Sequence, residues 1–369
     1  MGIKMGIVGL PNVGKSTLFN ALSSAGAESA NFPFCTIEPN VGVVTVPDFR
    51  LDKLAKVYGS KEVLPTTLEF VDIAGLVKGA SKGEGLGNQF LAHIREVDAL
   101  AHVVRCFDDE NIVHVHGDVD PKGDVEVIDT ELALRDLDSV EKRLDKTQKL
   151  AKATGKAGDD ARALLEILIA LQAHLAEGKP ARSLKINDEQ RKIVHELQLL
   201  TYKPVLFIAN IAEGAVGDPL QGAHVKSLQA VASAQGASVI PISAAIEAEV
   251  SELPPEDRQE YLASVGLEEP GLHRIIRESY KLLGLYTFLT AGPKETRAWT
   301  VRRGSTAPEA AGVIHTDFQR GFIRAEVMHW QDLVELGSEA AVKQAGKMRV
   351  EGKDYVVADG DVMHFRFNV

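Results

Sequence analysis

Residues 9–16 of the chain read GLPNVGKS, a spacing of glycine, lysine and serine that is suited to binding phosphate. The pattern is G-x-x-x-x-G-K-[ST], in which the backbone N–H groups of a tight loop point at phosphate oxygens. Gly9 and Gly14 allow the backbone to turn tightly because they carry no Cβ atom. Lys15 would add a full positive charge for the terminal phosphates, and Ser16 a hydroxyl ligand for Mg²⁺.

The neighbouring segments supply the elements that such a loop requires. Residues 3–8 are predicted as a strand and residues 17–22 as the start of a helix, whose N-terminus contributes a partial positive charge. The alternative is a glycine-rich turn that binds nothing, and the strand and helix on either side disfavour it. We therefore predict the phosphate-binding loop of a nucleoside triphosphatase, with nucleotide contacts from Asn12, Val13, Gly14, Lys15, Ser16 and Thr17.

A second group of candidate residues surrounds the end of the next predicted strand. Asp72 and Gly75 form the pattern Asp-x-x-Gly, in which the carboxylate holds Mg²⁺ through water and the glycine N–H contacts the γ-phosphate. Thr36 lies in the loop between the two motifs, and its hydroxyl is predicted to complete the Mg²⁺ ligands. The glycine-rich residues 78–87 are predicted to order when the γ-phosphate is present, with an ordinary flexible loop as the alternative. The predicted metal ligands are Ser16, Thr36 and Asp72.

Length, composition and charge limit the class of protein. A chain of 369 residues with 45% apolar residues can form two or three domains with substantial cores. No apolar run is long enough to cross a membrane, and the chain enters a predicted strand directly, so neither a membrane partner nor a cleaved signal is expected. Two cysteines are too few for a disulfide framework, which favours the cytoplasm. The net charge of −11 argues against a protein that coats nucleic acid, and no DNA sequence readout is expected.

Short apolar runs alternate with helical stretches and predict a doubly wound α/β domain with a mostly parallel sheet. The strand candidates are residues 68–72, 101–106, 205–209 and 238–242. Between about 128 and 200 the alternation stops, and leucines recur at helical spacing on both sides of a turn at 153–159. This pattern predicts an inserted helical hairpin or coiled coil, either as a simple pair of packed helices or as an arm that contacts a partner. After about residue 285, a small α+β domain is predicted from strand-like runs at 299–301, 312–314, 322–327 and 363–367.

These motifs carry a resemblance that extends over nearly the whole chain. The sequence resembles the Obg-related translation-factor GTPases, in particular their YchF branch, the Obg-like ATPases, at residues 9–16, 31–40, 72–87, 130–137, 290–292, 297–300, 315–318 and 359–369. The resemblance implies a G domain of the P-loop NTPase class at 1–283 that contains the helical insertion. It also implies a TGS domain of ubiquitin-like β-grasp fold at 284–369.

The segment expected at the nucleotide base departs from ordinary GTPases, which have Asn-Lys-x-Asp after a strand. Here Asn210, Ile211 and Glu213 stand at those positions. Isoleucine carries no charge, and glutamate is one methylene longer than aspartate, so a site for guanine would lose selectivity. The resemblance implies a preference for ATP over GTP, and a GTPase in which Glu213 still recognises guanine is the alternative. Ser243 and Ala244 match the last loop that contacts the base.

The group that orients the attacking water is also unusual. Leu76 stands where many GTPases have a glutamine, and its side chain forms no hydrogen bonds. His114 follows the strand predicted at 101–106, and an imidazole can orient or deprotonate water. The alternative is a surface histidine without a catalytic role. The predicted catalytic residues are His114, Lys15 and Gly75.

Two further contacts are predicted. Asn12 matches the asparagine that ligates K⁺ in related potassium-activated GTPases, which makes K⁺ a second candidate cofactor beside Mg²⁺; a turn-forming role is the alternative. Residues 294–324 carry six Lys or Arg against three Asp or Glu, interleaved with Trp299, Phe318 and Phe322. With the resemblance to ribosome-associated factors, this segment predicts contact with the ribosome or ribosomal RNA, against the alternative of core aromatics beneath a solvated surface.

Together these features predict a cytoplasmic, Mg²⁺-dependent ATPase that binds ATP and ADP and whose hydrolysis times the binding of a partner. A second alternative is a binding module gated by nucleotide, in which hydrolysis is incidental. The leucine at position 76 favours that alternative.

Overall fold

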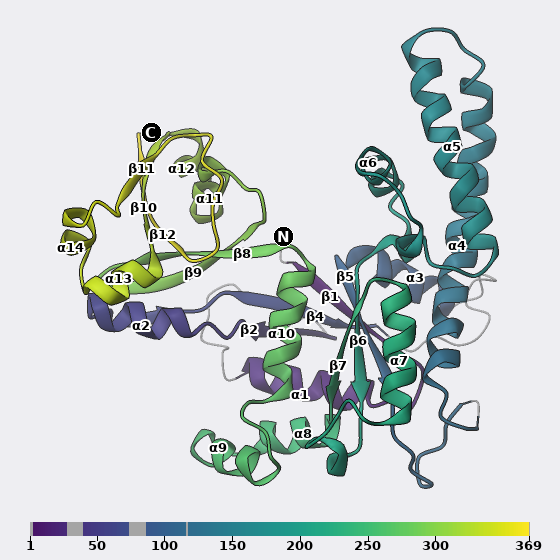
Figure 1. Ribbon diagram of the computed structural model, residues 1–369, viewed down its shortest axis with the longest axis horizontal. Helices are drawn as coiled ribbons and strands as arrows, with labels where there is room; N and C mark the ends of the chain where they lie inside the picture. The colour runs from purple at the N-terminus through teal and green to yellow at the C-terminus, as the bar shows by residue number, and fades with distance from the viewer. Residues whose placement is uncertain (1–2, 28–39, 74–85, 116, 369) are drawn as a thin grey trace. The chain divides into compact units, whose positions relative to one another are not determined.

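The computed structural model describes residues 3–27, 40–73, 86–115 and 117–368, which form two compact units (Figure 1). The first unit comprises Met1–Val43 and Glu69–Ile275, and the second comprises Val44–Leu68 and Ile276–Val369. A segment near the N-terminus thus groups with the C-terminal region, which differs from the predicted division at residues 283 and 284. Thr36, Gly75, Leu76 and residues 78–85 lie outside the described residues.

The sheet of the first unit has six strands in the order β2-β4-β1-β5-β6-β7. Strand β1 pairs in parallel with β4 and β5, and the pairs β5–β6 and β6–β7 are also parallel. Every residue of β5 and β6 is buried, as expected of apolar strands in a sheet that is covered on both faces. The predicted α/β class is confirmed. The strands are β1 (Lys4–Val8), β2 (Val41–Thr45), β4 (Thr67–Asp72), β5 (Ala99–Arg105), β6 (Val205–Asn210) and β7 (Ser238–Ile242).

The helices of the first unit include a long hairpin (Figure 1). Its two helices, α4 (Pro121–Leu150) and α5 (Lys156–Ala176), are the predicted insertion, although α4 begins earlier than expected. Gly155 at the turn has a φ of 78°, which glycine adopts without strain. The other helices are α1 (Lys15–Ala27), α3 (Leu86–Glu96), α6 (Asp188–Glu196), α7 (Ala223–Ala234), α8 (Ala244–Glu252), α9 (Pro255–Ser264), and the short η2 (Ala181–Ser183), η3 (Leu200–Tyr202) and η4 (Glu213–Ala215); α10 (Gly271–Leu282) crosses into the second unit.

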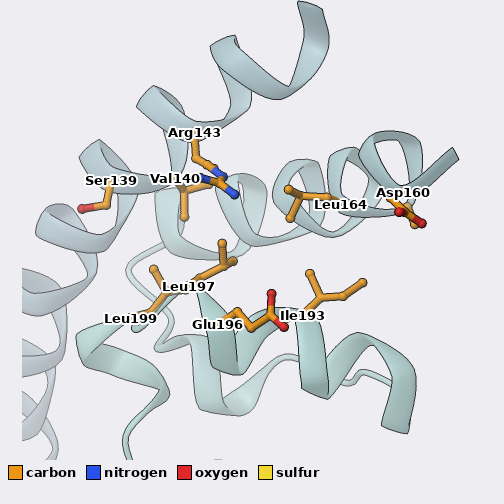
Figure 2. Close-up of a pocket in the computed structure, with 10 residues that line it drawn as sticks. Ser139, Val140, Arg143, Asp160, Leu164, Ile193, Glu196, Leu197 and Leu199 are labelled. Atoms are coloured by element: carbon orange, nitrogen blue, oxygen red, sulfur yellow. The ribbon is translucent and has the colours of Figure 1, made fainter. Parts of the chain in front are cut away.

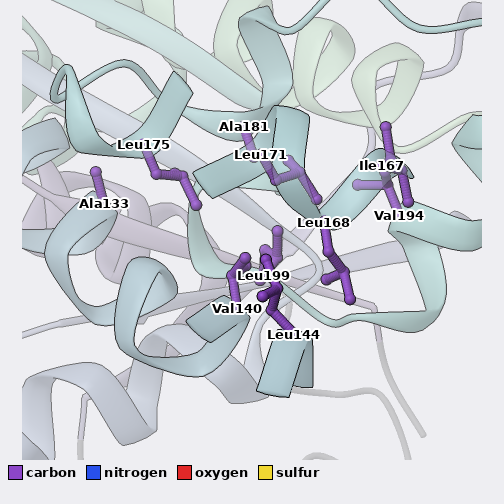
Figure 3. Close-up of a cluster of buried hydrophobic side chains, with 10 residues drawn as sticks. All are labelled: Ala133, Val140, Leu144, Ile167, Leu168, Leu171, Leu175, Ala181, Val194 and Leu199. Carbon is purple, nitrogen blue, oxygen red and sulfur yellow. The ribbon is translucent and has the colours of Figure 1, made fainter. Parts of the chain in front are cut away.

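The hairpin has its own hydrophobic core (Figure 3). Leucines that recur at helical spacing on α5, such as Leu168 and Leu171, are fully buried against Val140 and Leu144 of α4. Val194 of α6 and Leu199 close the same cluster. The periodicity seen in the sequence therefore reflects the packing of two helices against each other and against α6.

The second unit contains a mixed six-stranded sheet in the order β11-β10-β12-β8-β9-β3. Its edge strand β3 comes from the N-terminal segment and pairs in parallel with β9. In the same segment, Arg50 of α2 forms an ion pair of 2.7 Å with Asp359. The strands are β3 (Glu62–Leu64), β8 (Leu285–Ala291), β9 (Glu295–Arg302), β10 (Phe322–His329), β11 (Arg349–Glu351) and β12 (Asp361–Phe367), and the helices are α2 (Phe49–Tyr58), α11 (Ala307–Ile314), α12 (Thr316–Arg320), α13 (Trp330–Leu336) and α14 (Glu339–Gln344).

One predicted strand of this unit is wrong. Residues 312–314 form the last turn of α11 rather than a strand. Thr306 and Glu309 form a capping box at the start of this helix, and a proline follows in its first turn. These start signals outweigh the β propensity of three apolar residues.

Within the part of the chain that the structure describes, no helix is both long enough and apolar enough to cross a membrane.

Candidate nucleotide site

The loop between β1 and α1 leaves no room for a Cβ atom at two positions. A Cβ atom at Gly9 would lie 2.6 Å from the carbonyl oxygen of Val103, and one at Gly14 would lie 2.2 Å from Nδ2 of Asn210. Gly14 also has a φ of 92°, and Asn12 has a φ of 64°. The close approach of the backbone to its neighbours therefore explains both glycines of the motif.

Lys15 and Asp72 face each other from the start of α1 and the end of β4. Their Nζ and Oδ1 atoms are 3.4 Å apart, and the two side chains are largely buried. Ser16 and Thr17 are exposed at the start of α1. A cation suited to phosphates, a carboxylate and an exposed hydroxyl therefore come from the start of α1 and the end of β4, and these are the groups that a polyphosphate with Mg²⁺ requires. The other predicted ligand, Thr36, lies outside the described residues, as does Gly75.

Asn210 connects three elements through its buried side chain. Its Nδ2 donates to the carbonyl of Val13 at 2.9 Å, and its Oδ1 accepts from the N–H of Ala244 at 3.0 Å. Both bonds join the end of β6 to the phosphate loop and to the first residue of α8. The side chain therefore shapes the predicted base region through the positions of Val13 and Ala244.

The remaining residues predicted near the base differ in exposure. Ile211 is only 3% exposed, and its N–H donates to the carbonyl of Ile242 at 2.8 Å. Ser243 is likewise buried, at the N-terminal end of α8. Glu213 is exposed as the first residue of η4. Glu213 is thus the one among these residues whose charge is open to solvent.

His114 lies on the loop after β5, as predicted, but its side chain is not on the surface. Its Nε2 is 3.0 Å from Oδ2 of Asp124, in the first turn of α4, and both side chains are 3% exposed. The backbone of the same loop contacts the phosphate loop, because Nδ2 of Asn12 donates to the carbonyl of Val113 at 3.2 Å. The structure therefore brings Asn12 and the loop of His114 together.

Arg105, at the end of β5, was not singled out in the sequence. Its guanidinium donates to three backbone carbonyls, those of Phe107 at 3.0 Å, Asp109 at 3.0 Å and Ile112 at 2.8 Å. The residue is 1% exposed, so these bonds organise the loop that leads to His114 from within the fold. The available signal was a charged residue inside an apolar run, which requires polar partners when it is buried.

In the basic segment of the second unit, the aromatic side chains and the cations lie in different surroundings. Phe322 is a buried member of a hydrophobic cluster, and Trp299 and Phe318 pack against that cluster. The aromatic residues thus serve the core at least in part, as the alternative interpretation expected. The cations at 294, 302, 303, 320 and 324 are exposed.

A cavity of about 580 Å³ lies between α4, α5 and α6 (Figure 2). Its lining mixes apolar side chains such as Val140 and Leu164 with the charged Arg143, Asp160 and Glu196. Among the predicted nucleotide-site residues that the structure describes, none lines this cavity.

The parallel sheet and the phosphate loop define a P-loop nucleoside triphosphatase. A family model described as a 50S ribosome-binding GTPase matches residues 4–210, and the model of the YchF-GTPase C-terminal region, described as a protein of unknown function, matches residues 285–368. The chain belongs to the YchF family, which confirms the resemblance found in the sequence.

Relatives in this family match the chain from end to end. Proteins named ribosome-binding ATPase YchF from Bacillus subtilis (strain 168) and Escherichia coli O157:H7 are each 55% identical, with the whole of both chains covered. The solved structure of the Schizosaccharomyces pombe YchF GTPase is 39% identical, with a TM-score of 0.89 and coverage of 99% of this chain and 98% of that one.

Proposed function

We propose that the protein is a Mg²⁺-dependent ATPase that acts as a nucleotide-controlled switch on the ribosome. The observation that carries this proposal is the phosphate loop with Lys15 facing Asp72 at 3.4 Å. Bacterial relatives of the same length that are named ribosome-binding ATPase support both the reaction and the partner.

In this proposal each residue of the loop has a defined task. The backbone N–H groups of residues 12–17 and the ammonium of Lys15 bind the phosphates. Ser16 and Thr36 bind Mg²⁺ directly, and Asp72 binds it through water. When bound, Mg²⁺ neutralises phosphate charge and supports transfer of the γ-phosphoryl group to water. Gly75 contacts the γ-phosphate through its N–H group.

The proposed preference for ATP depends on residues 210–213. An isoleucine and a longer carboxylate replace the lysine and aspartate that read guanine, while the backbone around Ser243 and Ala244 approaches the purine. Since the fungal relative is titled a GTPase, guanine recognition by Glu213 remains the alternative to be tested.

Calorimetric titration with ATP, GTP, ADP and GDP in the presence of Mg²⁺ tests the site and its base preference together. We expect ATP to bind more tightly than GTP, and Lys15→Ala to weaken binding about 100-fold through loss of a charged hydrogen bond. Lys4→Ala is the matched control, because Lys4 lies at the other end of β1 and pairs with Glu69. Tight binding of ATP to the Lys15→Ala protein would contradict the assignment of the loop, and tighter binding of GTP would support the alternative.

We also propose that His114 acts on the attacking water in place of the missing glutamine. General acid–base groups typically contribute at least about 100-fold, so His114→Ala should lower kcat by that factor without weakening ATP binding. Unchanged turnover would remove this role.

Comparing turnover in K⁺ and Na⁺ tests the proposed K⁺ contact of Asn12, and equal rates would count against it.

The nucleotide-gated binding module remains a second candidate because Leu76 cannot orient water. Single-turnover hydrolysis with and without ribosomes separates the two functions: stimulation supports a ribosome-linked ATPase, and nucleotide-dependent binding without stimulation supports the module.

We assign the ribosomal RNA contact to the exposed cations of residues 294–324 in a TGS-type domain. Association that does not weaken as salt rises would refute that contact.

A further inference from the structure

The pair formed by His114 and Asp124 has a geometry that can orient the imidazole. The distance between Nε2 and Oδ2 is 3.0 Å, and each side chain is only 3% exposed. A carboxylate can only accept a hydrogen bond, so it selects the neutral tautomer with the hydrogen on Nε2. In that tautomer Nδ1 carries no hydrogen and holds the acceptor lone pair of the ring.

The backbone next to this imidazole is fixed to the phosphate loop. The carbonyl of Val113 accepts from Asn12 at 3.2 Å, while the side chain of the next residue reaches Asp124 on α4. Arg105 holds the preceding part of the loop through three carbonyls. Two adjacent residues therefore connect the phosphate loop to the first turn of the helix that continues into the hairpin.

We propose that Asp124 is a positioning residue for ATP hydrolysis: it sets the tautomer and orientation of His114 and so links the attack of water to the base of the α4–α5 hairpin. This inference rests on the proposed role of His114. An aspartate beside a catalytic histidine performs this task in unrelated hydrolytic sites, where the carboxylate itself takes up no proton. A displacement of the first turn of α4 would change the position of the ring, and with it the rate.

A second buried aspartate of α4 provides a contrast within the same helix. Asp129 pairs with Arg182 at 2.5 Å and accepts from Gln235 at 2.7 Å. These partners come from η2 and from the residue after α7, and neither belongs to the phosphate loop or to the loop of His114. Asp129 thus resembles Asp124 in burial and pairing, but its contacts are structural.

The test compares kcat, KM and ATP binding for Asp124→Ala, Asp124→Asn and the control Asp129→Asn. We expect Asp124→Ala to lower kcat at least about tenfold while the dissociation constant for ATP changes by less than about threefold, as for other residues that act through a catalytic group. Asp124→Asn should also lower kcat at least about tenfold, because its amide can donate to Nε2 and then favours the tautomer with the hydrogen on Nδ1. Asp129→Asn should lower the unfolding midpoint and leave kcat within about twofold.

Combination with His114→Ala distinguishes positioning from a general effect on the fold. If Asp124 acts through His114, Asp124→Ala produces no further loss of kcat in the His114→Ala protein. An equal loss in both backgrounds would overturn the inference, and so would normal or faster hydrolysis by both Asp124 variants. If His114→Ala alone leaves kcat unchanged, the proposed role of His114 fails first; if that variant is slow while both Asp124 variants are normal, only the present inference fails.

Discussion

Polar side chains are held in different ways at the phosphate-loop end of the first unit and in the basic segment 294–324 of the second. At the phosphate-loop end, buried side chains donate to main-chain carbonyls: Arg105 to three in the loop that follows it, and Asn210 to that of Val13 in the phosphate loop. In the basic segment, cations contact near neighbours on the surface. Arg320 pairs with Asp317, three residues away, and Arg297 lies 4.0 Å above the ring of Trp299.

Because the donors are buried in one region and exposed in the other, substitutions in the two regions should have different effects on stability. Removing a buried donor leaves carbonyls without partners, and the loops that they belong to lose their positions. Removing an exposed cation costs little, because water solvates the partner that remains. Residues at the phosphate-loop end therefore influence stability and turnover together, whereas those of the basic segment act on function only through an external partner.

The largest effect is expected for Arg105→Met, which keeps an unbranched side chain but removes every donor. Three loop carbonyls lose their bonds from a buried guanidinium, so the free energy of unfolding should fall by about 3 kcal/mol, and turnover should fall because the loop of His114 is no longer held. Urea denaturation and steady-state ATPase rates measure the two effects. Arg324→Met, at an exposed site, is the control and should change neither. Equal free energies of unfolding for the two variants would contradict the difference proposed between buried and exposed cations.

A smaller effect is expected for Asn210→Ala. The loss of two bonds, to Val13 and from Ala244, should lower the free energy of unfolding by about 2 kcal/mol and weaken ATP binding through the displaced phosphate loop. Asn210→Asp keeps the acceptor for the Ala244 N–H but cannot donate to Val13, so it separates the two bonds. Calorimetry and urea denaturation of both variants provide the measurement, and native affinity in both would contradict the proposed connection.

The free energy of unfolding is also expected to depend on pH through His102, a buried residue of the first unit. Burial of His102 in β5 lowers its pKa to about 4, against an opposing charge from Asp129 and a reinforcing one from Arg182. Because the unfolded chain binds this proton more readily, the contribution of His102 to stability is present above pH 6.5 and is lost as the pH falls toward 4. The loss between pH 7 and pH 5 is about 2 kcal/mol by linkage.

The difference between the wild type and His102→Gln measures this contribution. Burial raises the pKa values of Asp136 and Glu247, which act in the opposite direction, so the total pH profile alone does not isolate His102. Urea denaturation at pH 7 and pH 5 should reveal a smaller pH effect in His102→Gln than in the wild type. The exposed His315, in the basic segment, provides the control variant His315→Gln. If His102→Gln loses as much stability as the wild type, the buried histidine is not the cause.

Much of the first region was predictable because local backbone geometry dictates residue type. Gly9 and Gly14 are required by close approaches of the backbone, and apolar runs mark the buried strands. The pairing of His114 with Asp124 was not predictable, since the partner comes from a helix start that looks like any acidic first turn. The strand predicted at residues 312–314 was wrong for a related reason. Three residues of this kind suit a strand or the end of a capped helix equally well.

The basic segment was harder to interpret because its residue types do not reveal which side chains the core uses. Phe322 belongs to the core, and Trp299 donates from its indole N–H to Thr290 at 2.9 Å. The burial of each aromatic side chain therefore decides whether it serves the core or a binding surface. The β3 strand of the second unit was equally hidden. Its partner β9 lies more than two hundred residues further along the chain, beyond the reach of any local pattern.

The smallest effect on stability, and the sharpest test of the basic segment, is expected for Arg320→Ala combined with Arg324→Ala. Both side chains are exposed, and the pair of Arg320 with Asp317 joins residues within one helical turn, so the free energy of unfolding should change by less than about 0.5 kcal/mol. Ribosome association should nevertheless weaken, with a shallower dependence on salt, because fewer phosphate contacts release fewer counterions. Co-sedimentation at several salt concentrations measures this. If binding and its salt slope are unchanged, the cations at 320 and 324 contribute no phosphate contact, and the functional surface lies elsewhere on the molecule.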